Sequence, residues 1–244
     1  MHFLQPAAYD GSMSNLALPP TLPTPARTGT GHVAVTGAQS LLDTLVALGV
    51  DTIFGYPGGA VLPVYDALHA ERRIRHVLVR HEQAAVHAAE GYARSTGKPG
   101  VVLVTSGPGV SNTITGLLDA ICDSVPVLCI SGQVATHSIG TDAFQECDAL
   151  GLSRPVTKWN AQIRSADQVA ALVRKALRVA TQGRPGPVLL DFPKDIQLAT
   201  LNAPSETPGE RPESRRKPLR RVTVRNLSAC APGIAIARQC GCFS

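Results

Sequence analysis

The sequence has no apolar run that could cross a membrane, and it has few aromatic residues. A membrane-spanning helix needs roughly 18 consecutive apolar residues, and no stretch of this chain approaches that length. The N-terminus has no basic stretch followed by an apolar one, so we expect no secretory signal and a cytoplasmic protein. Aromatic residues make up 4% of a chain that is 44% hydrophobic, so the core must consist mainly of Val, Leu, Ile and Ala.

Paired cysteine motifs are absent as well. Metal and redox pairs commonly have two residues between their cysteines, whereas Cys240 and Cys242 are separated by one residue and are followed by no histidine. We therefore expect free thiols in a reducing compartment. The six thiols are Cys122, Cys129, Cys147, Cys230, Cys240 and Cys242.

The net charge of +5 does not indicate a nucleic-acid-binding face, because it is confined to one end of the chain. The segment from Ser205 onward carries eight of the 23 basic and three of the 18 acidic residues. That leaves fifteen of each sign before Ser205, so the larger part of the chain is neutral. We interpret the charge as belonging to a solvated tail, and we expect neither nucleic acid nor a membrane as a partner.

Composition divides the chain into three segments. Residues 1–32 and 201–244 are rich in Pro, Ser and other polar or small residues and show no period, so we expect both to be disordered. Residues 33–200 alternate between apolar runs and helical periods, which predicts one domain. The expected strands are 51–54, 74–79, 101–105, 127–131, 156–163 and 188–192, and the expected helices are 41–48, 61–69, 82–95, 110–122 and 165–180.

Two of these helices begin with the pattern of a capping box, in which a hydroxyl and an amide side chain satisfy the free N–H groups of the first turn. Thr36 and Gln39 form one such pair, and Ser165 and Gln168 form the other. Gly49 follows the last apolar residue of the first helix and indicates where that helix ends.

Continuous apolar strands that alternate with helices are typical of a parallel sheet covered on both faces. We therefore predict an α/β fold with an open, mostly parallel sheet and helices on both faces. Right-handed crossovers would place every strand-to-helix turn at one edge of this sheet, where open α/β sheets bind ligands. The expected turns at that edge are 55–59, 80–83, 106–109 and 132–133, two of which contain several glycines.

Three common enzyme motifs can be excluded. The turn 107–112 lacks the final glycine of the dinucleotide-binding fingerprint. Residues 91–98 are spaced one residue too widely for a phosphate-binding loop, and they end a helix instead of beginning one. His81 and Glu82 could begin a zinc-protease motif, but residue 85 is Ala and His87 falls on another face of the helix. We interpret both histidines as packing or hydrogen-bonding residues and expect no metal ligand in this chain.

The sequences of these turns together resemble those of the acetolactate synthases, which are thiamine diphosphate enzymes. The resemblance runs from about residue 35 to about residue 200 and implies the pyrimidine-binding domain of that family. The segment 139–146, Ile-Gly-Thr-Asp-Ala-Phe-Gln-Glu, is more specific to this family than to thiamine enzymes in general. The other matching segments are 55–60, 80–83, 105–109, 132–134, 183–187 and 193–197.

The resemblance gives Glu82 a catalytic role in addition to a structural one. An acid in the first turn of a helix is already favoured by the helix dipole, by about 0.3–1 kcal/mol. In the family, this position accepts a hydrogen bond from the pyrimidine nitrogen of thiamine diphosphate. A carboxylate there favours the tautomer whose exocyclic nitrogen acts as a base toward the reactive carbon of the cofactor.

The resemblance also assigns roles to residues that would otherwise be read as turn, loop or surface positions. Pro57 and Gly59 match positions against the pyrimidine ring, and Gln145 matches a position beside the cofactor and the substrate. Ser124 and Arg184 match residues that contact FAD, which the family keeps in a non-redox role. The positions that match the substrate channel are Phe144, Gln145 and Lys194.

The function that the resemblance implies is condensation of two pyruvate molecules to 2-acetolactate with loss of carbon dioxide, a step of branched-chain amino acid biosynthesis. The family also has an FAD-contacting domain and a domain that holds the diphosphate and Mg²⁺, and we find neither in this sequence, so we expect a truncated domain that is inactive alone. The alternatives are a fragment of another thiamine diphosphate carboligase or decarboxylase, or a non-catalytic module. The expected partners are pyruvate, a second copy of the chain or a full-length synthase, and a small regulatory subunit.

These boundaries can be tested by limited proteolysis of the 244-residue chain. We expect a resistant core near residues 33–200, because neither flanking segment has enough apolar residues to offset the entropy lost on ordering. Mass spectrometry of the fragments locates the cleavage sites. Protection of the Arg-rich segment after Ser205 would contradict the three-segment division.

Overall fold

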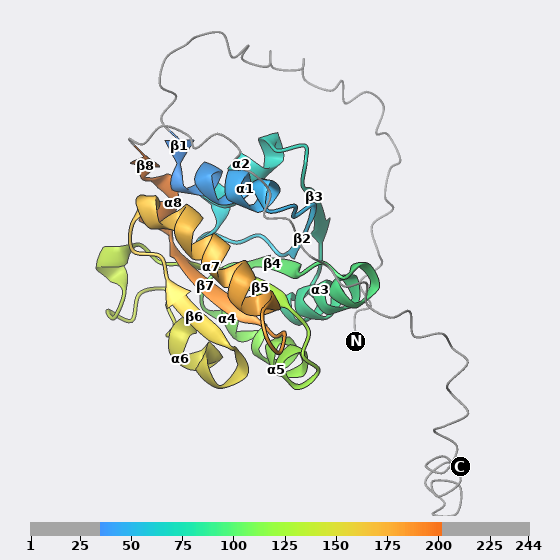
Figure 1. The fold of residues 1–244 in the computed structure, drawn as a ribbon. Helices are drawn as coiled ribbons and strands as arrows, with labels where there is room; N and C mark the ends of the chain where they lie inside the picture. Colours follow the sequence, from blue (N-terminus) through green and yellow to red (C-terminus); the bar gives the residue numbers. More distant parts are fainter. Residues whose placement is uncertain (1–34, 202–244) are drawn as a thin grey trace, which may run out of the picture. The chain divides into compact units, whose positions relative to one another are not determined.

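The computed structural model describes residues 35–201, and Figure 1 shows their arrangement. Six strands form one sheet in the order β3-β2-β4-β5-β7-β6, and every neighbouring pair is parallel. Two short strands form a separate antiparallel pair. The strands are β1 (Val35–Thr36), β2 (Thr52–Gly55), β3 (Arg75–Leu78), β4 (Gly100–Val104), β5 (Val127–Gln133), β6 (Trp159–Gln162), β7 (Val188–Pro193) and β8 (Thr200–Leu201).

Helices cover both faces of the six-stranded sheet (Figure 1). The first face is covered by α1 (Gly37–Ala47), α2 (Leu62–Ala70), α7 (Val169–Thr181) and α8 (Lys194–Leu198). The second face is covered by α3 (Glu82–Thr96), α4 (Pro108–Ser111), α5 (Ile114–Cys122) and α6 (Ala149–Ser153). Residues 35–201 also contain three 3₁₀ turns, η1 (Thr136–Ser138), η2 (Arg154–Val156) and η3 (Ala166–Gln168).

The strands alternate their apolar side chains between these two layers. In β4, Val101 and Leu103 belong to the core under α1 and α7, whereas Val102 and Val104 belong to the core under α3 and α5. Because both faces are buried, β4 is apolar at every position. This arrangement confirms the predicted α/β fold with an open parallel sheet and helices on both faces.

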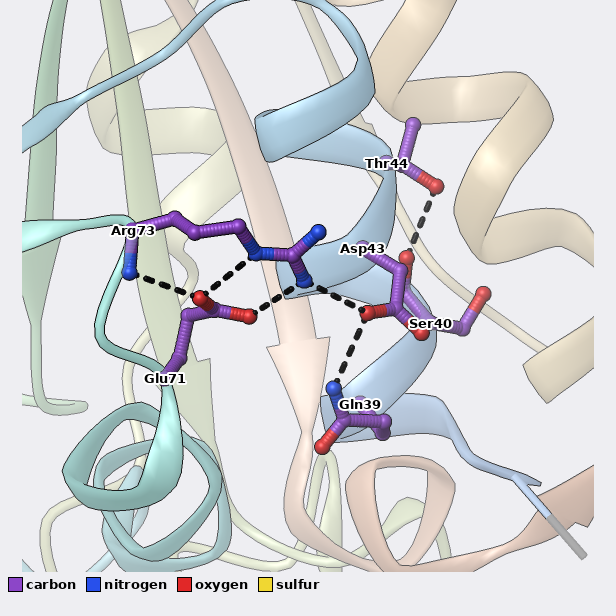
Figure 2. Close-up of polar contacts among 6 residues, drawn as sticks. All are labelled: Gln39, Ser40, Asp43, Thr44, Glu71 and Arg73. Atoms are coloured by element: carbon purple, nitrogen blue, oxygen red, sulfur yellow. Dashed lines mark hydrogen bonds and ion pairs between the residues drawn. The ribbon is translucent and has the colours of Figure 1, made fainter. Parts of the chain in front are cut away.

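The first predicted cap is confirmed only in part. The Thr36 hydroxyl accepts a hydrogen bond from the Gln39 backbone N–H at 3.1 Å, and α1 ends where expected, before Gly49 at φ +82°. The Gln39 side chain does not complete the capping box but donates to Asp43 at 3.0 Å. Asp43 also lies 3.7 Å from Arg73, which pairs with Glu71 before β3 (Figure 2).

Two other expectations were wrong in detail. The predicted helix 110–122 is interrupted, because the Thr113 hydroxyl donates to the Val110 carbonyl at 2.6 Å and ends α4 there. The predicted capping box of Ser165 and Gln168 does not form, and this segment is instead a 3₁₀ turn without a side-chain cap. The β1–β8 pair was not expected, since strands of two residues are too short to show a period.

Several expectations concern residues beyond those described. The segments 1–32 and 202–244, with the thiols of Cys230, Cys240 and Cys242, lie outside the described residues. Within residues 35–201, Cys122, Cys129 and Cys147 are free thiols, as expected. No helix of this described part has the length and apolar character needed to cross a membrane.

Two helical glycines give opposite predictions for substitution by alanine. A Cβ at Gly37 would lie 2.2 Å from the backbone oxygen of Ile196, so Gly37→Ala must separate α1 from α8 and should destabilise by about 1–3 kcal/mol. A Cβ at Gly91, in the exposed middle of α3, would meet nothing within 4 Å, so Gly91→Ala should stabilise by about 0.5–1 kcal/mol. Urea denaturation measures the change in the free energy of unfolding for each variant. Changes of the same sign in the two variants would contradict the packing described here.

Candidate functional site

The loops that follow the strands meet at the carboxyl edge of the sheet, and their backbones lie unusually close together. The Thr105 hydroxyl, just after β4, accepts a hydrogen bond from the Ala60 N–H at 3.3 Å. A Cβ at Gly58 would lie 2.5 Å from Thr105, so only glycine fits there. Gly107 has φ +55°, and a Cβ on it would lie 2.6 Å from the backbone oxygen of Gln145. Segments far apart in sequence are thus gathered into one surface.

Glu82 stands at this edge as the first residue of α3. The preceding residue, His81, caps the helix by accepting from the Gln83 N–H at 3.2 Å, which confirms the hydrogen-bonding role expected for it. Glu82 itself is 7% exposed, an unusual burial for a carboxylate. Its Oε2 accepts a hydrogen bond from the Asn112 side-chain amide at 2.9 Å. No residue in the described part of the chain donates to its Oε1, which faces the backbone at Gly109.

Sequence reasoning missed Asn112, the residue that positions Glu82. Asn112 lies in the break between α4 and α5, where it ends α4. The expected uninterrupted helix would have placed residue 112 as one of many helix-surface positions. The only sequence signal was an amide followed by a β-branched hydroxyl residue, Thr113, which favours local bonds to the backbone.

The long loop between β5 and α6 is fixed at several points. At its start, Asp195 in α8 accepts hydrogen bonds from the backbone N–H of Thr136, at 3.0 Å, and from its hydroxyl. Within it, the Glu146 carboxylate accepts from the backbone N–H groups of Gly140, Thr141 and Ala143, and these bonds lower the pKa of Glu146. This carboxylate, which sequence reasoning did not single out, therefore folds the segment 139–146 around itself.

A buried polar network lies beneath the same loop. Asp191, near the end of β7, is 1% exposed and accepts from the side chains of Ser131 at 3.1 Å, Gln133 at 3.3 Å and Gln162 at 2.9 Å. The Gln133 amide also donates to the Cys147 carbonyl at 3.0 Å, which ties the network to the loop. Burial raises the pKa of Asp191 to about 6, although the three donors act against this.

The structure brings most of the sequence-predicted site residues to this edge. Gln145 lies against Gly107 with φ +59°, and Lys194 is the half-buried first residue of α8. Phe144 is 87% exposed, so its ring makes little contact with the described residues. Pro57 and Gly59 are exposed in the turn after β2.

Ser124 and Arg184 are brought together, but away from Glu82. The Arg184 guanidinium donates to the Ser124 hydroxyl at 2.8 Å and to the carbonyls of Ile121 and Cys122 at the end of α5. Both residues precede strands, β5 and β7, and therefore lie at the amino edge of the sheet, opposite Glu82. An arginine that caps helix carbonyls has a structural role of its own, and contact with FAD stays a prediction.

A hollow of about 380 Å³ also lies at the amino edge. It is lined by residues 46–50 before β2, with Thr52, Tyr92, Lys98 and Pro99. Its polar groups are already engaged, since Asp51 accepts from Tyr92 at 2.5 Å and from Lys98, and these bonds lower the pKa of Asp51 to about 2. We therefore place the candidate site at the carboxyl edge, around Glu82, and not in this hollow.

Comparison with known proteins agrees with the motifs. Residues 35–152 match the family model described as "Thiamine pyrophosphate enzyme, N-terminal TPP binding domain". The chain is 52% identical over 178 residues to the mitochondrial acetolactate synthase catalytic subunit of Saccharomyces cerevisiae. It is 55% identical over 174 residues to the acetolactate synthase large subunit of Haemophilus influenzae, and 54% identical over 180 residues to the isozyme 3 large subunit of Escherichia coli.

The matches cover much of this chain but a minor part of each relative. They span 73%, 71% and 74% of the 244 residues, respectively. They span 26%, 30% and 31% of the lengths of the three relatives. The resemblance that the motifs indicated is thereby confirmed for the matched segment.

The buried Asp191 should make stability depend on pH. Its pKa is raised from 3.8 to about 6 on folding, so the unfolded chain releases this proton first, and stability falls as pH rises from about 4 to about 6. The loss of stability caused by burying the ionised Asp191 carboxylate is complete above about pH 6 and amounts to about 3 kcal/mol at most. We expect the stability of the wild type relative to Asp191→Asn to fall across this window in urea denaturation. A difference that is flat between pH 4 and pH 7 would contradict a neutral, buried Asp191 at low pH.

Proposed function

Because this chain belongs to the acetolactate synthase family of thiamine pyrophosphate enzymes, we propose that its carboxyl edge holds the aminopyrimidine of thiamine pyrophosphate through Glu82. The reaction it would serve is the condensation of two pyruvate molecules to 2-acetolactate with loss of carbon dioxide. The observation that carries the proposal is the state of the Glu82 carboxylate: it is buried, one oxygen is anchored by Asn112, and the other has no donor in the described chain.

The residues present suit the cofactor's ring. A protonated aminopyrimidine nitrogen donates a hydrogen bond and needs a single acceptor oxygen held in a fixed direction. Oε1 of Glu82 is such an acceptor because the hydrogen bond from Asn112 prevents the carboxylate from turning. A Cβ at Gly59 would meet nothing within 4 Å, so the turn after β2 leaves open space at this position for a flat ring. When bound, thiamine pyrophosphate supplies a carbon nucleophile that takes up the two-carbon unit of a 2-ketoacid.

Glu82 would act by holding a proton at the ring nitrogen. The burial of its carboxylate lowers the local dielectric, which strengthens its interaction with a protonated nitrogen. The Asn112 amide donates to the other oxygen and so holds the carboxylate in one orientation. This pair keeps an acceptor in place without reorganisation during the reaction, which is how preorganised groups contribute to rate.

The neighbouring loop would supply contacts to the substrate. We propose that Gln145 reaches the cofactor and substrate, and that Phe144 and Lys194 line the substrate channel, with Pro57 and Gly59 against the pyrimidine ring. The exposed Phe144 ring supports this, because a large apolar side chain held out by an ordered loop is suited to contact with a bound molecule or another domain. A lysine at the same edge offers a positive charge to the carboxylate of a 2-ketoacid.

The rest of the activity is proposed from the relatives. Binding of the diphosphate with Mg²⁺, and FAD contacts beyond Ser124 and Arg184, would come from parts of the synthase that these 244 residues do not match. We propose that those parts come from a second chain, such as a full-length synthase in a dimer, with a small regulatory subunit as a further partner. We also propose a cytoplasmic location, although the Saccharomyces cerevisiae relative is described as mitochondrial.

The 244-residue chain alone should not turn over pyruvate. Its carboxyl edge offers contacts to the pyrimidine but few to the diphosphate, so we expect weak cofactor binding and no acetolactate. Pyruvate loss and acetolactate formation are measured with purified chain, thiamine pyrophosphate, FAD and Mg²⁺. Turnover above the blank would show that the chain has all the catalytic parts it needs.

Glu82 can be tested in a chimaera in which residues 35–201 replace the matching segment of the Escherichia coli relative. We expect Glu82→Gln to lower turnover by about 10²–10⁴-fold, because an amide cannot stabilise a protonated ring nitrogen. Exchange of the C2 proton of bound cofactor, followed by NMR, should slow in parallel. The matched control is Asp66→Asn, an exposed acid in α2, which should leave both rates unchanged. If the C2 proton exchanges at the normal rate in Glu82→Gln, Glu82 serves only as a charge at the start of the helix and the proposal is wrong.

A further inference from the structure

A second cluster of polar side chains lies between α3 and α5, on the outer side of the domain. The two helices approach closely, since a Cβ at Gly116 would lie 2.6 Å from the Cβ of Val86. One turn further along the helices stand Glu90 on α3 and Asp119 on α5, with His87 beside them. The ligand atoms of His87, Glu90 and Asp119 all lie within 4.8 Å of one another.

The carboxylate of Glu90 is only partly paired within the described chain. Glu90 is 4% exposed, and its Oε1 has no hydrogen-bond partner among residues 35–201. The nearby cation, Arg94, donates at 2.5 Å to Asp123 instead. Buried carboxylates are normally paired or bound to a cation, whereas Glu90 and Asp119 share a single histidine, His87, at 3.6 Å.

The distances suit a small cation. His87 Nδ1 lies 3.6 Å from Glu90 Oε2 and 3.6 Å from Asp119 Oδ2. Two ligands of a tetrahedral zinc ion, each bound at about 2.0–2.2 Å, are about 3.4 Å apart. The His87 and Asp119 side chains are 42% and 50% exposed, which leaves room for water as a fourth ligand. We propose that His87, Glu90 and Asp119 bind a divalent transition-metal cation of the zinc type, which joins α3 to α5.

This site is distinct from the proposed thiamine site. Glu90 is eight residues from Glu82 along α3, or about 12 Å at the rise of an α-helix. It also departs from our expectation from the sequence, in which the spacing of His81 and residue 85 excluded a zinc-protease motif and His87 was interpreted as a packing or hydrogen-bonding residue. His87 and Glu90 are three positions apart on one helix face, and the third ligand, Asp119, comes from another helix.

The experiment is a zinc titration of the full 244-residue chain with Cys122, Cys230, Cys240 and Cys242 changed to Ser, so that thiols do not compete. We expect calorimetry to show one zinc ion per chain with a Kd in the micromolar range, and the melting temperature to rise on zinc addition. His87→Ala should weaken this binding by about 100-fold or more. The matched control, His69→Ala, removes an exposed histidine of α2 and should leave binding unchanged.

A second variant keeps the proposal testable if His87→Ala disturbs folding. Glu90→Gln preserves the size of the side chain and removes the partly paired charge, so the metal-free chain should be at least as stable as the wild type. The same variant should bind zinc at least 10-fold more weakly. Zinc binding that survives Glu90→Gln, or a wild type that binds no stoichiometric zinc, would overturn the proposal.

Discussion

The six-stranded sheet is parallel throughout, and the rest of the structure depends on that constraint. A parallel strand cannot be reached by a tight turn, so the chain must cross back after each strand. Every strand therefore ends at the same edge, and the segments that follow are forced together. Thr105 holds the turn after β2, and Gly107 admits the backbone of Gln145. The parallel topology therefore brings together the segments that form the surface around Glu82, and single residues only adjust their fit.

The carboxyl and amino edges of this sheet differ in how their side chains are bonded. At the carboxyl edge, buried polar groups such as Asp191 and Gln133 fix the loops from beneath, while Phe144 extends outward with little contact inside the chain. At the amino edge, Arg184 and Lys98 are already bonded to groups of the same domain. An edge with rigid loops and exposed, unengaged side chains is suited to face a cofactor and a second domain, whereas the amino edge is largely self-contained.

The sequence was sufficient to predict the elements whose signals are local. Apolar runs located the central strands within a few residues, and the position of Glu82 after a strand placed it at the ligand-binding edge. It was insufficient where a signal depends on partners distant in sequence. Asn112 became visible only through the helix break at Thr113, and Asp191 only because three strands bring its donors together. Such contacts cannot be derived from hydrophobic periodicity, which reports burial and not hydrogen-bond partners.

The central claim is that the carboxyl edge, and no other surface of this domain, recognises an aminopyrimidine. It is tested most directly by titrating thiamine, which has the ring but not the diphosphate, into the ¹⁵N-labelled chain at millimolar concentration. The account predicts amide shift changes that cluster at Gly58, Glu82, Gln83 and Gly107. Changes confined to the hollow lined by residues 46–50, or no changes at the carboxyl edge, would contradict it.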